Sequence, residues 1–128
     1  MERPAPTSGM HHVALNVINL EECEQFYVGL LGMKIEWRPD NDNVYLCSGN
    51  DNLALHRLPA GKRPEGTQRL DHIGFVLNEP GLVDEWYEYL SAHEVKIKAA
   101  PKTHRDGARS FYCEDPAGNV VQMIYYLP

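Results

Sequence analysis

Two short segments of this chain, residues 10–17 and 70–77, alternate between apolar and polar residues. Such alternation predicts β-strands, because successive side chains of a strand point to opposite faces of the sheet. The two segments lie 60 positions apart, and each carries a histidine at the equivalent position, His12 and His72. Two equivalent histidines on two equivalent strands can meet in a shared cavity, which is a first indication of a metal site.

A helix is predicted after each of these strands. Asn19 is a good N-cap, and Glu22 follows three residues later as in a capping box. Apolar residues recur at helical spacing over 20–31, and Gly32 ends the segment. In the second half, Pro80 suits the first turn of a helix that carries a similar apolar stripe.

The remaining apolar segments predict six further strands, at 33–38, 44–48, 53–58, 95–99, 109–114 and 120–127. Residues 10–56 and 70–124 therefore repeat one plan, β-α-β-β-β, and each copy must complete its core against the other. Pro39 opens a turn by composition, and the polar residues 101–108 predict a long loop at the rim of a cavity.

The repeat predicts one domain built from two modules. Residues 1–9 are expected to form a frayed tail, 10–58 the first module and 70–128 the second. Residues 59–69, rich in Pro, Gly and charge, form the linker. This linker is too short to separate independent domains, so the modules should pack together.

Composition narrows the range of partners. The chain has 128 residues, 43% of them hydrophobic, and a formal net charge of −6, with no basic run longer than Lys62-Arg63. Nucleic acid and anionic membranes are therefore poor partners. No apolar stretch approaches the roughly 20 residues of a membrane helix, and we find no signal-peptide pattern. The spacing of Cys23, Cys47 and Cys113 suggests no disulfide framework, so we expect free thiols in a cytoplasmic protein.

Three motifs occur in a characteristic order: HVALNV at 12–17 followed by FY and LLG, DHIGF at 71–75, and FYCEDPAGNVVQ at 111–122. In this order they resemble the vicinal oxygen chelate superfamily of glyoxalases, bleomycin resistance proteins and extradiol dioxygenases. The resemblance implies an α+β fold of two tandem βαβββ modules, which form a curled mixed sheet around a central cleft. It also implies a small-molecule substrate and a homodimer.

The resemblance further implies metal ligands on the first and fourth strands of each half, at His12, Ala54, His72 and Gln122. Ala54 cannot bind a metal, and Gln122 stands where the family most often has Glu. A neutral amide oxygen attracts a cation less, although the bound ion would be a stronger Lewis acid. We expect His12, His72 and Gln122 to hold Zn, Ni, Mn or Fe. The alternative is that the histidines and Gln122 are hydrogen-bonded residues that merely line a cleft.

Strand alternation adds other candidates. His56 lies two residues after Ala54 and faces the same side, as a third imidazole or as part of the cavity wall. Proton transfer would fall to His56 or Tyr112, the latter at a family position that points into the cavity. Lys102, His104, Arg105 and Arg109 form a positive cluster that favours an anionic substrate or simply adds solubility. The candidate substrate-binding residues are Asn16, Ser110, His104 and Arg109.

Three functions remain open. The first is a metal-dependent lyase or isomerase of the glyoxalase type, although positions 54 and 122 lack the carboxylate that would shuttle a proton. The second is a metal-free protein of the bleomycin-resistance type that binds a small molecule. The third resembles an extradiol dioxygenase, which needs two histidines and a carboxylate on Fe(II). A fosfomycin-type transferase fits less well, because Ala14 replaces a hydroxylated residue.

Overall fold

The computed structural model describes residues 2, 6, 10–60 and 70–126. Most of the expected tail at 1–9, the linker segment 61–69 and residues 127–128 lie outside the described residues. No helix in the described part of the chain is long and apolar enough to cross a membrane.

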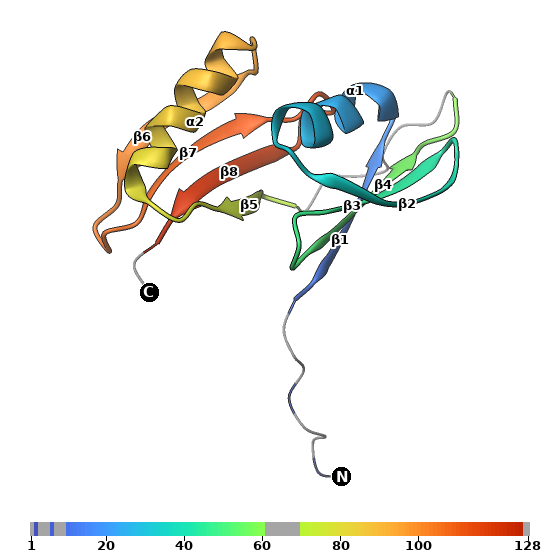
Figure 1. Ribbon diagram of the computed structural model, residues 1–128, viewed down its shortest axis with the longest axis horizontal. Helices are drawn as coiled ribbons and strands as arrows, with labels where there is room; N and C mark the ends of the chain where they lie inside the picture. Colours follow the sequence, from blue (N-terminus) through green and yellow to red (C-terminus); the bar gives the residue numbers. More distant parts are fainter. Residues whose placement is uncertain (1, 3–5, 7–9, 61–69, 127–128) are drawn as a thin grey trace.

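The structure consists of two βαβββ modules (Figure 1). The first contains β1 (His12–Val17), α1 (Leu20–Glu24), the π-helical turn η1 (Gln25–Leu30), β2 (Lys34–Asp40), β3 (Asn43–Cys47) and β4 (Asn52–Arg57). The second contains β5 (Ile73–Val76), α2 (Pro80–Ala92), β6 (Ile97–Thr103), β7 (Arg109–Glu114) and β8 (Val120–Tyr125). The predicted α+β class and the tandem modules are confirmed.

Each module forms its own four-stranded sheet, in the orders β1-β4-β3-β2 and β5-β8-β7-β6. The first strand of each module pairs in parallel with the last, and the other pairs are antiparallel. Figure 1 shows both helices on the same side of the two sheets. We call the opposite side of each sheet its open face.

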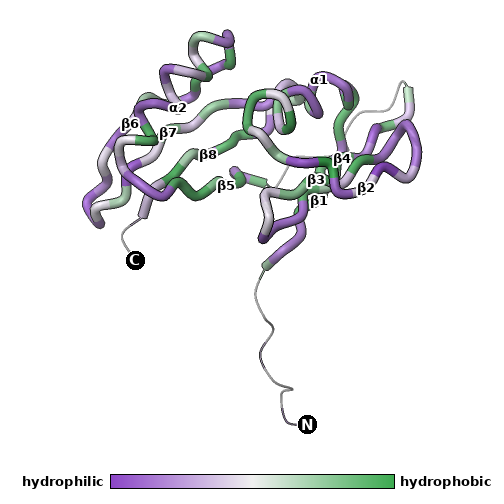
Figure 2. The backbone as a smooth tube through the Cα atoms, in the orientation of Figure 1, coloured by the Kyte–Doolittle hydropathy of each residue, from purple (hydrophilic) through white to green (hydrophobic). Residues whose placement is uncertain are grey.

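Alternation along the strands assigns side chains to the two faces. On β1, Leu15 and Val17 are buried on the helix-covered face, whereas His12, Ala14 and Asn16 are exposed on the open face. This confirms the faces predicted from the sequence. Figure 2 shows the hydrophobic residues on the inner strands and hydrophilic residues along the outer strands β2 and β6.

The outer strands correct the predicted boundaries. Residues 101–103 belong to β6, with Lys102 paired to Ser110, so the loop expected at 101–108 begins only at residue 104. Pro39 likewise lies inside β2 and not in a turn. Both prolines, Pro39 and Pro101, lie at register shifts of edge strands, where a missing N–H group breaks no ladder. Polar, proline-containing edge strands carry little of the apolar signal that predicts a strand.

The first helix also differs from its prediction. One continuous helix was expected, but α1 passes into η1, where the Leu31 N–H donates to the Phe26 carbonyl five residues back. Asn19 makes no side-chain cap, so the predicted capping box is wrong. Its Nδ2 donates instead to the Pro116 carbonyl at 2.8 Å, which ties the start of α1 to the second module. Gly32 ends the helix at φ +81°, as predicted.

One hydrophobic core joins the modules. Tyr27 of η1 is fully buried, lies 6.2 Å from the ring of Phe75 on β5, and donates its hydroxyl to Asp115 at 2.7 Å. The Asp115 carboxylate also accepts hydrogen bonds from the backbone N–H groups of Ala117 and Asn119 and from the Asn119 amide. The DPAGN turn is therefore a structural anchor, and the modules pack as one body.

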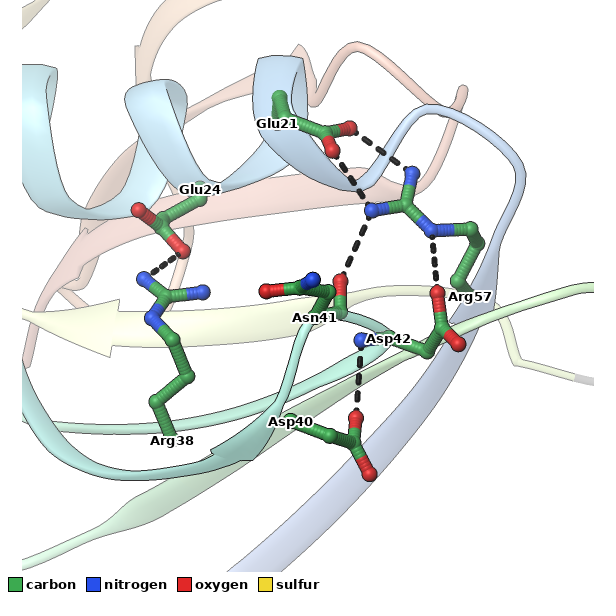
Figure 3. A network of polar contacts seen from close by, with 7 residues as sticks. All are labelled: Glu21, Glu24, Arg38, Asp40, Asn41, Asp42 and Arg57. Atoms are coloured by element: carbon green, nitrogen blue, oxygen red, sulfur yellow. Dashed lines mark hydrogen bonds and ion pairs between the residues drawn. The ribbon is translucent and has the colours of Figure 1, made fainter.

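Polar contacts also hold α1 to its own sheet (Figure 3). Arg57 at the end of β4 donates to both carboxylate oxygens of Glu21 at 2.6 and 2.8 Å and to Asp42 at 2.9 Å. The Arg57 guanidinium lowers the pKa of Glu21 to about 2. A second ion pair joins Arg38 of β2 to Glu24. These contacts hold α1 against β2 and β4, and β4 carries the candidate residue His56.

Candidate functional site

The open face of the second sheet carries a continuous chain of polar side chains. Gln122 of β8 donates its Nε2 to the Ser110 hydroxyl at 3.1 Å and to the Tyr112 hydroxyl at 3.0 Å. His104 extends the chain from the loop, with its Nε2 2.9 Å from the Ser110 hydroxyl. The rings of Tyr112 and His72 meet edge to face, with centroids 5.3 Å apart. The structure therefore brings together five of the residues singled out from the sequence.

Gln122 is held so that its carbonyl oxygen is available. Both of its amide hydrogens are directed to the hydroxyls of Ser110 and Tyr112, and the side chain is buried. The Oε1 atom is directed to β5, because a Cβ added at Gly74 would lie 3.6 Å from it. No described residue donates a hydrogen bond to this oxygen. This oxygen is the one atom of Gln122 that can coordinate a cation.

Three histidines on the open faces share one arrangement. The Nδ1 atom of His72 lies 2.6 Å from the Asp71 carboxylate, that of His12 lies 2.5 Å from Asn52 Oδ1, and that of His56 lies 2.6 Å from Asn43 Oδ1. These oxygens can only accept, so each imidazole carries its proton on Nδ1. The Nε2 lone pair is then free to bind a metal or accept a proton, as in metal sites where an oxygen orients the histidine.

The first sheet presents a different open face. Asn16 and His56 are register partners on β1 and β4, and Ala14 is paired with Ala54. The edge of the Tyr45 ring meets His56 at a centroid distance of 6.0 Å, and Trp37 stacks on Tyr45 at 5.2 Å. This face offers aromatic rings and two histidines, His12 and His56, but no carboxylate from strands β1 or β4.

His12 lies on the open face of the first sheet, whereas His72 and Gln122 lie on that of the second. Across residues 10–60 and 70–126, no hydrogen bond, ion pair or ring contact joins His12 to His72 or Gln122. The same part of the chain contains no group of three or more His, Cys, Asp or Glu residues placed to hold a metal. A site that uses His12, His72 and Gln122 combines side chains from the open faces of both sheets.

Arg109, expected at the substrate, lies on the helix-covered side. Its guanidinium donates to both carboxylate oxygens of Asp84 on α2, at 2.7 and 2.9 Å, and to the Thr103 hydroxyl at 3.0 Å. The pairing raises the pKa of Arg109 and lowers that of Asp84. Arg109 therefore holds α2 against β7 and does not face the polar chain.

Two of the three thiols, Cys23 and Cys113, are buried and take no part in this chemistry. All three cysteines are free, as predicted, and burial raises the pKa values of Cys23 and Cys113 to about 12. Buried thiols with such values are protonated and unreactive at neutral pH.

Several residues that contact the candidate side chains were not predicted from the sequence. Asp71 precedes His72 directly and could have been found as a neighbouring acceptor. Asn52 lies two residues before Ala54, on the same face of β4, but its pairing with His12 depends on the parallel register of β1 and β4. Asn43 and Trp37 come from other strands, and no local signal connects them with His56 or Tyr45.

The fold, the repeated histidines and the DPAGN turn together define a glyoxalase-like protein. The chain belongs to the Glyoxalase/Bleomycin resistance protein/Dioxygenase superfamily, whose family model matches residues 9–123. Among curated proteins it is similar to the metallothiol transferase FosB of Staphylococcus haemolyticus, with 26% identity over 90% of this chain and 81% of the relative. It is also 30% identical to an uncharacterized protein of Pseudomonas aeruginosa, over 91% of this chain and 88% of that protein.

Solved structures support the fold. A lactoylglutathione lyase from Agrobacterium tumefaciens superposes with a TM-score of 0.77 at 24% identity, covering 94% of this chain and 96% of the other. TioX from Micromonospora sp. ML1 superposes with a TM-score of 0.74 at 16% identity, covering 94% and 100%. At these identities the likeness shows the shared fold and leaves the activity open.

Proposed function

We propose that this chain is a divalent-metal-dependent lyase or isomerase that acts on a small substrate with vicinal oxygens. His12, His72 and Gln122 would hold the ion, which can be Zn, Ni, Mn or Fe. The observation that carries this proposal is the orientation of the donors. Both imidazoles direct Nδ1 to a fixed oxygen and keep Nε2 free, and the amide of Gln122 is anchored with its carbonyl oxygen uncovered.

The proposed chemistry follows from these side chains. A divalent ion at this site would polarise two vicinal oxygens and stabilise the negative charge that develops on them. Tyr112 accepts a hydrogen bond from Gln122, so its own hydroxyl proton can be donated to a substrate oxygen. His56, with a free Nε2 held in place by Asn43, can accept a proton. Asn16, Ser110 and His104 would orient the substrate by hydrogen bonds.

We propose further that the protein acts as a homodimer, in which His12 of one chain lies beside His72 and Gln122 of another. Within one chain no contact joins these residues, and β1 and β5 are edge strands of separate sheets. Edge strands of this kind are free to pair with a second copy, and a two-fold dimer would form two equivalent sites.

Metal content tests the proposal. Untagged protein incubated with Zn, Ni, Mn or Fe(II) and then desalted should retain about one ion per chain, and His12→Ala and His72→Ala should each abolish retention. His93→Ala, at the exposed end of α2, is the control and should retain the ion. Wild-type protein that retains none of the four ions would contradict the proposal.

Mixing the two variants tests the shared site. If the ligands come from two chains, co-refolded His12→Ala and His72→Ala proteins should regain up to about a quarter of the wild-type metal, because half of the dimers are mixed and each has one intact site. If one chain supplies all ligands, mixing restores nothing. That second result would exclude the proposed dimeric site while leaving the metal proposal intact.

A metal-free binding protein is the second candidate. The observation that favours it is the absence of a carboxylate at both ligand positions that could have carried one, Ala54 and Gln122. A dioxygenase is less consistent with the site, since no carboxylate completes a triad with the two histidines. The FosB relatives carry metallothiol transferase in their name, which supports an ion in this family, but they share only 26% identity.

A further inference from the structure

Three aromatic rings form a ladder on the open face of the first sheet. Trp37 of β2 stacks on Tyr45 of β3 with an interplanar angle of 23°, and the edge of Tyr45 meets His56 of β4 at 80°. Trp37 is 58% exposed, and its ring packs on Tyr45. A large ring that remains in water while it supports a second ring presents a flat surface to a ligand.

The repeat shows that this surface is specific to the first module. Tyr45 pairs with Ala54 in the first module, and Tyr112 pairs with Gln122 in the second. Tyr45 therefore corresponds to Tyr112, and Ala54 corresponds to Gln122. Trp37 corresponds to Ala99 by the same pairing. The second module therefore fills its face with a hydrogen-bonded amide, whereas the first has the small Ala54 side chain beside Tyr45 and the exposed ring of Trp37.

Polar groups converge on the same surface. The Tyr112 hydroxyl accepts a hydrogen bond from Gln122, but the Tyr45 hydroxyl has no hydrogen-bond partner within residues 10–60 and 70–126. His56 has its Nδ1 bonded to Asn43 and its Nε2 free, and Asn16 lies beside it in the register. A ring stacked here would find hydrogen-bonding groups at its edge.

We propose that Trp37 and Tyr45 form a stacking subsite for a planar aromatic substrate, with His56 accepting a hydrogen bond from a hydroxyl group on its ring. This proposal specifies the substrate class of the enzyme proposed above, so it rests on the proposed function. The stacking itself needs no ion, so the subsite can be measured with the metal-free protein.

The test uses calorimetric titration of EDTA-treated full-length protein with 2-naphthol. Decahydro-2-naphthol, the saturated analogue, has the same hydroxyl on a non-planar ring, and 2-methoxynaphthalene keeps the planar ring without the donor. We expect each analogue to bind about tenfold more weakly than 2-naphthol. Equal affinity for the saturated analogue would overturn the stacking subsite, and equal affinity for the methoxy compound would overturn the role of His56.

Variants locate the binding. Trp37→Leu keeps an apolar side chain but removes the ring, and should weaken 2-naphthol binding about tenfold while metal retention is unchanged. Tyr89→Leu removes another exposed aromatic ring, on α2, and should have no effect on 2-naphthol. If Trp37→Leu instead dissociates the dimer and leaves 2-naphthol binding intact, the ladder is a contact between copies and the proposal is wrong. A wild-type protein that binds 2-naphthol but retains no metal would contradict the proposed function and leave the stacking subsite supported.

Discussion

At the scale of single residues, Gln122 determines how tightly the candidate site would bind a cation and how strongly that cation would polarise a substrate. Its amide nitrogen is bonded to two hydroxyls and its oxygen faces β5 beside a glycine. A neutral ligand binds a divalent ion less tightly than a carboxylate does, but it leaves more of the positive charge to act on a substrate. The residue is therefore well placed for a weakly held, strongly polarising ion.

Replacing Gln122 by glutamate should reverse this balance. The hydroxyls of Ser110 and Tyr112 can rotate to donate to a carboxylate, so Gln122→Glu should preserve the local structure. We expect affinity for Zn or Mn to rise about tenfold or more, since a full negative charge faces the ion. Competition with a fluorescent chelator measures this, and Gln25→Glu, at an exposed position of η1, is the matched control. Unchanged affinity in Gln122→Glu would show that residue 122 does not touch the ion.

At the scale of elements, the two modules repeat more than their order of strands. The edge strands β2 and β6 each contain two register shifts with a proline at the second, and both first strands pair in parallel with the last. The inner strands were predicted well, because their alternation reports one buried face. Strands β2 and β6 were predicted short, since their exposed and proline-containing sequences resemble loops.

The end of η1 offers a test at this scale. Gly32 has φ +81° with no atom within 4 Å of an added Cβ, so a side chain there would be strained without any clash. Gly32→Ala should lower the free energy of unfolding by about 1–2 kcal/mol, measured by urea denaturation. Gly81→Ala, in the first turn of α2 with equally open surroundings, should leave stability unchanged or slightly raised. Equal effects of the two substitutions would argue against backbone strain at Gly32.

At the scale of the whole molecule, the modules are coupled through η1. Tyr27 reaches from the first module into the core of the second, where its hydroxyl meets Asp115. Asp115 is 3% exposed, and its carboxylate is satisfied by donors from the DPAGN turn and from Tyr27. This contact fixes how the two sheets sit relative to each other, and through them the candidate residues.

Removing one hydroxyl tests this coupling. Tyr27→Phe retains the ring in the core but takes one donor from a buried carboxylate, and should cost about 1.5–3 kcal/mol of unfolding free energy. Tyr89→Phe, at an exposed tyrosine of α2, should cost nothing measurable. Denaturation followed separately by fluorescence and circular dichroism would also show whether the modules still unfold together. A loss similar to that of Tyr89→Phe would mean that the buried hydrogen bond contributes little.

The sequence alone was sufficient for several features that depend on neighbours along the chain. Period-two alternation placed His12, Ala14 and Asn16 on one face, and the repeat placed His72 at the position equivalent to His12. The helix-ending Gly32 followed from local rules as well. These predictions held because each depends on backbone geometry over a few residues.

Only the tertiary structure decided which distant residues meet. It paired His12 with Asn52, directed Arg109 to Asp84 and away from the open face, and placed Trp37 over Tyr45. Each of these contacts depends on strand register or helix packing, which the chain sets through its whole core and not through any local motif. The relative position of the His12 and His72 faces is of the same kind, since it follows from how two sheets pack around one shared core.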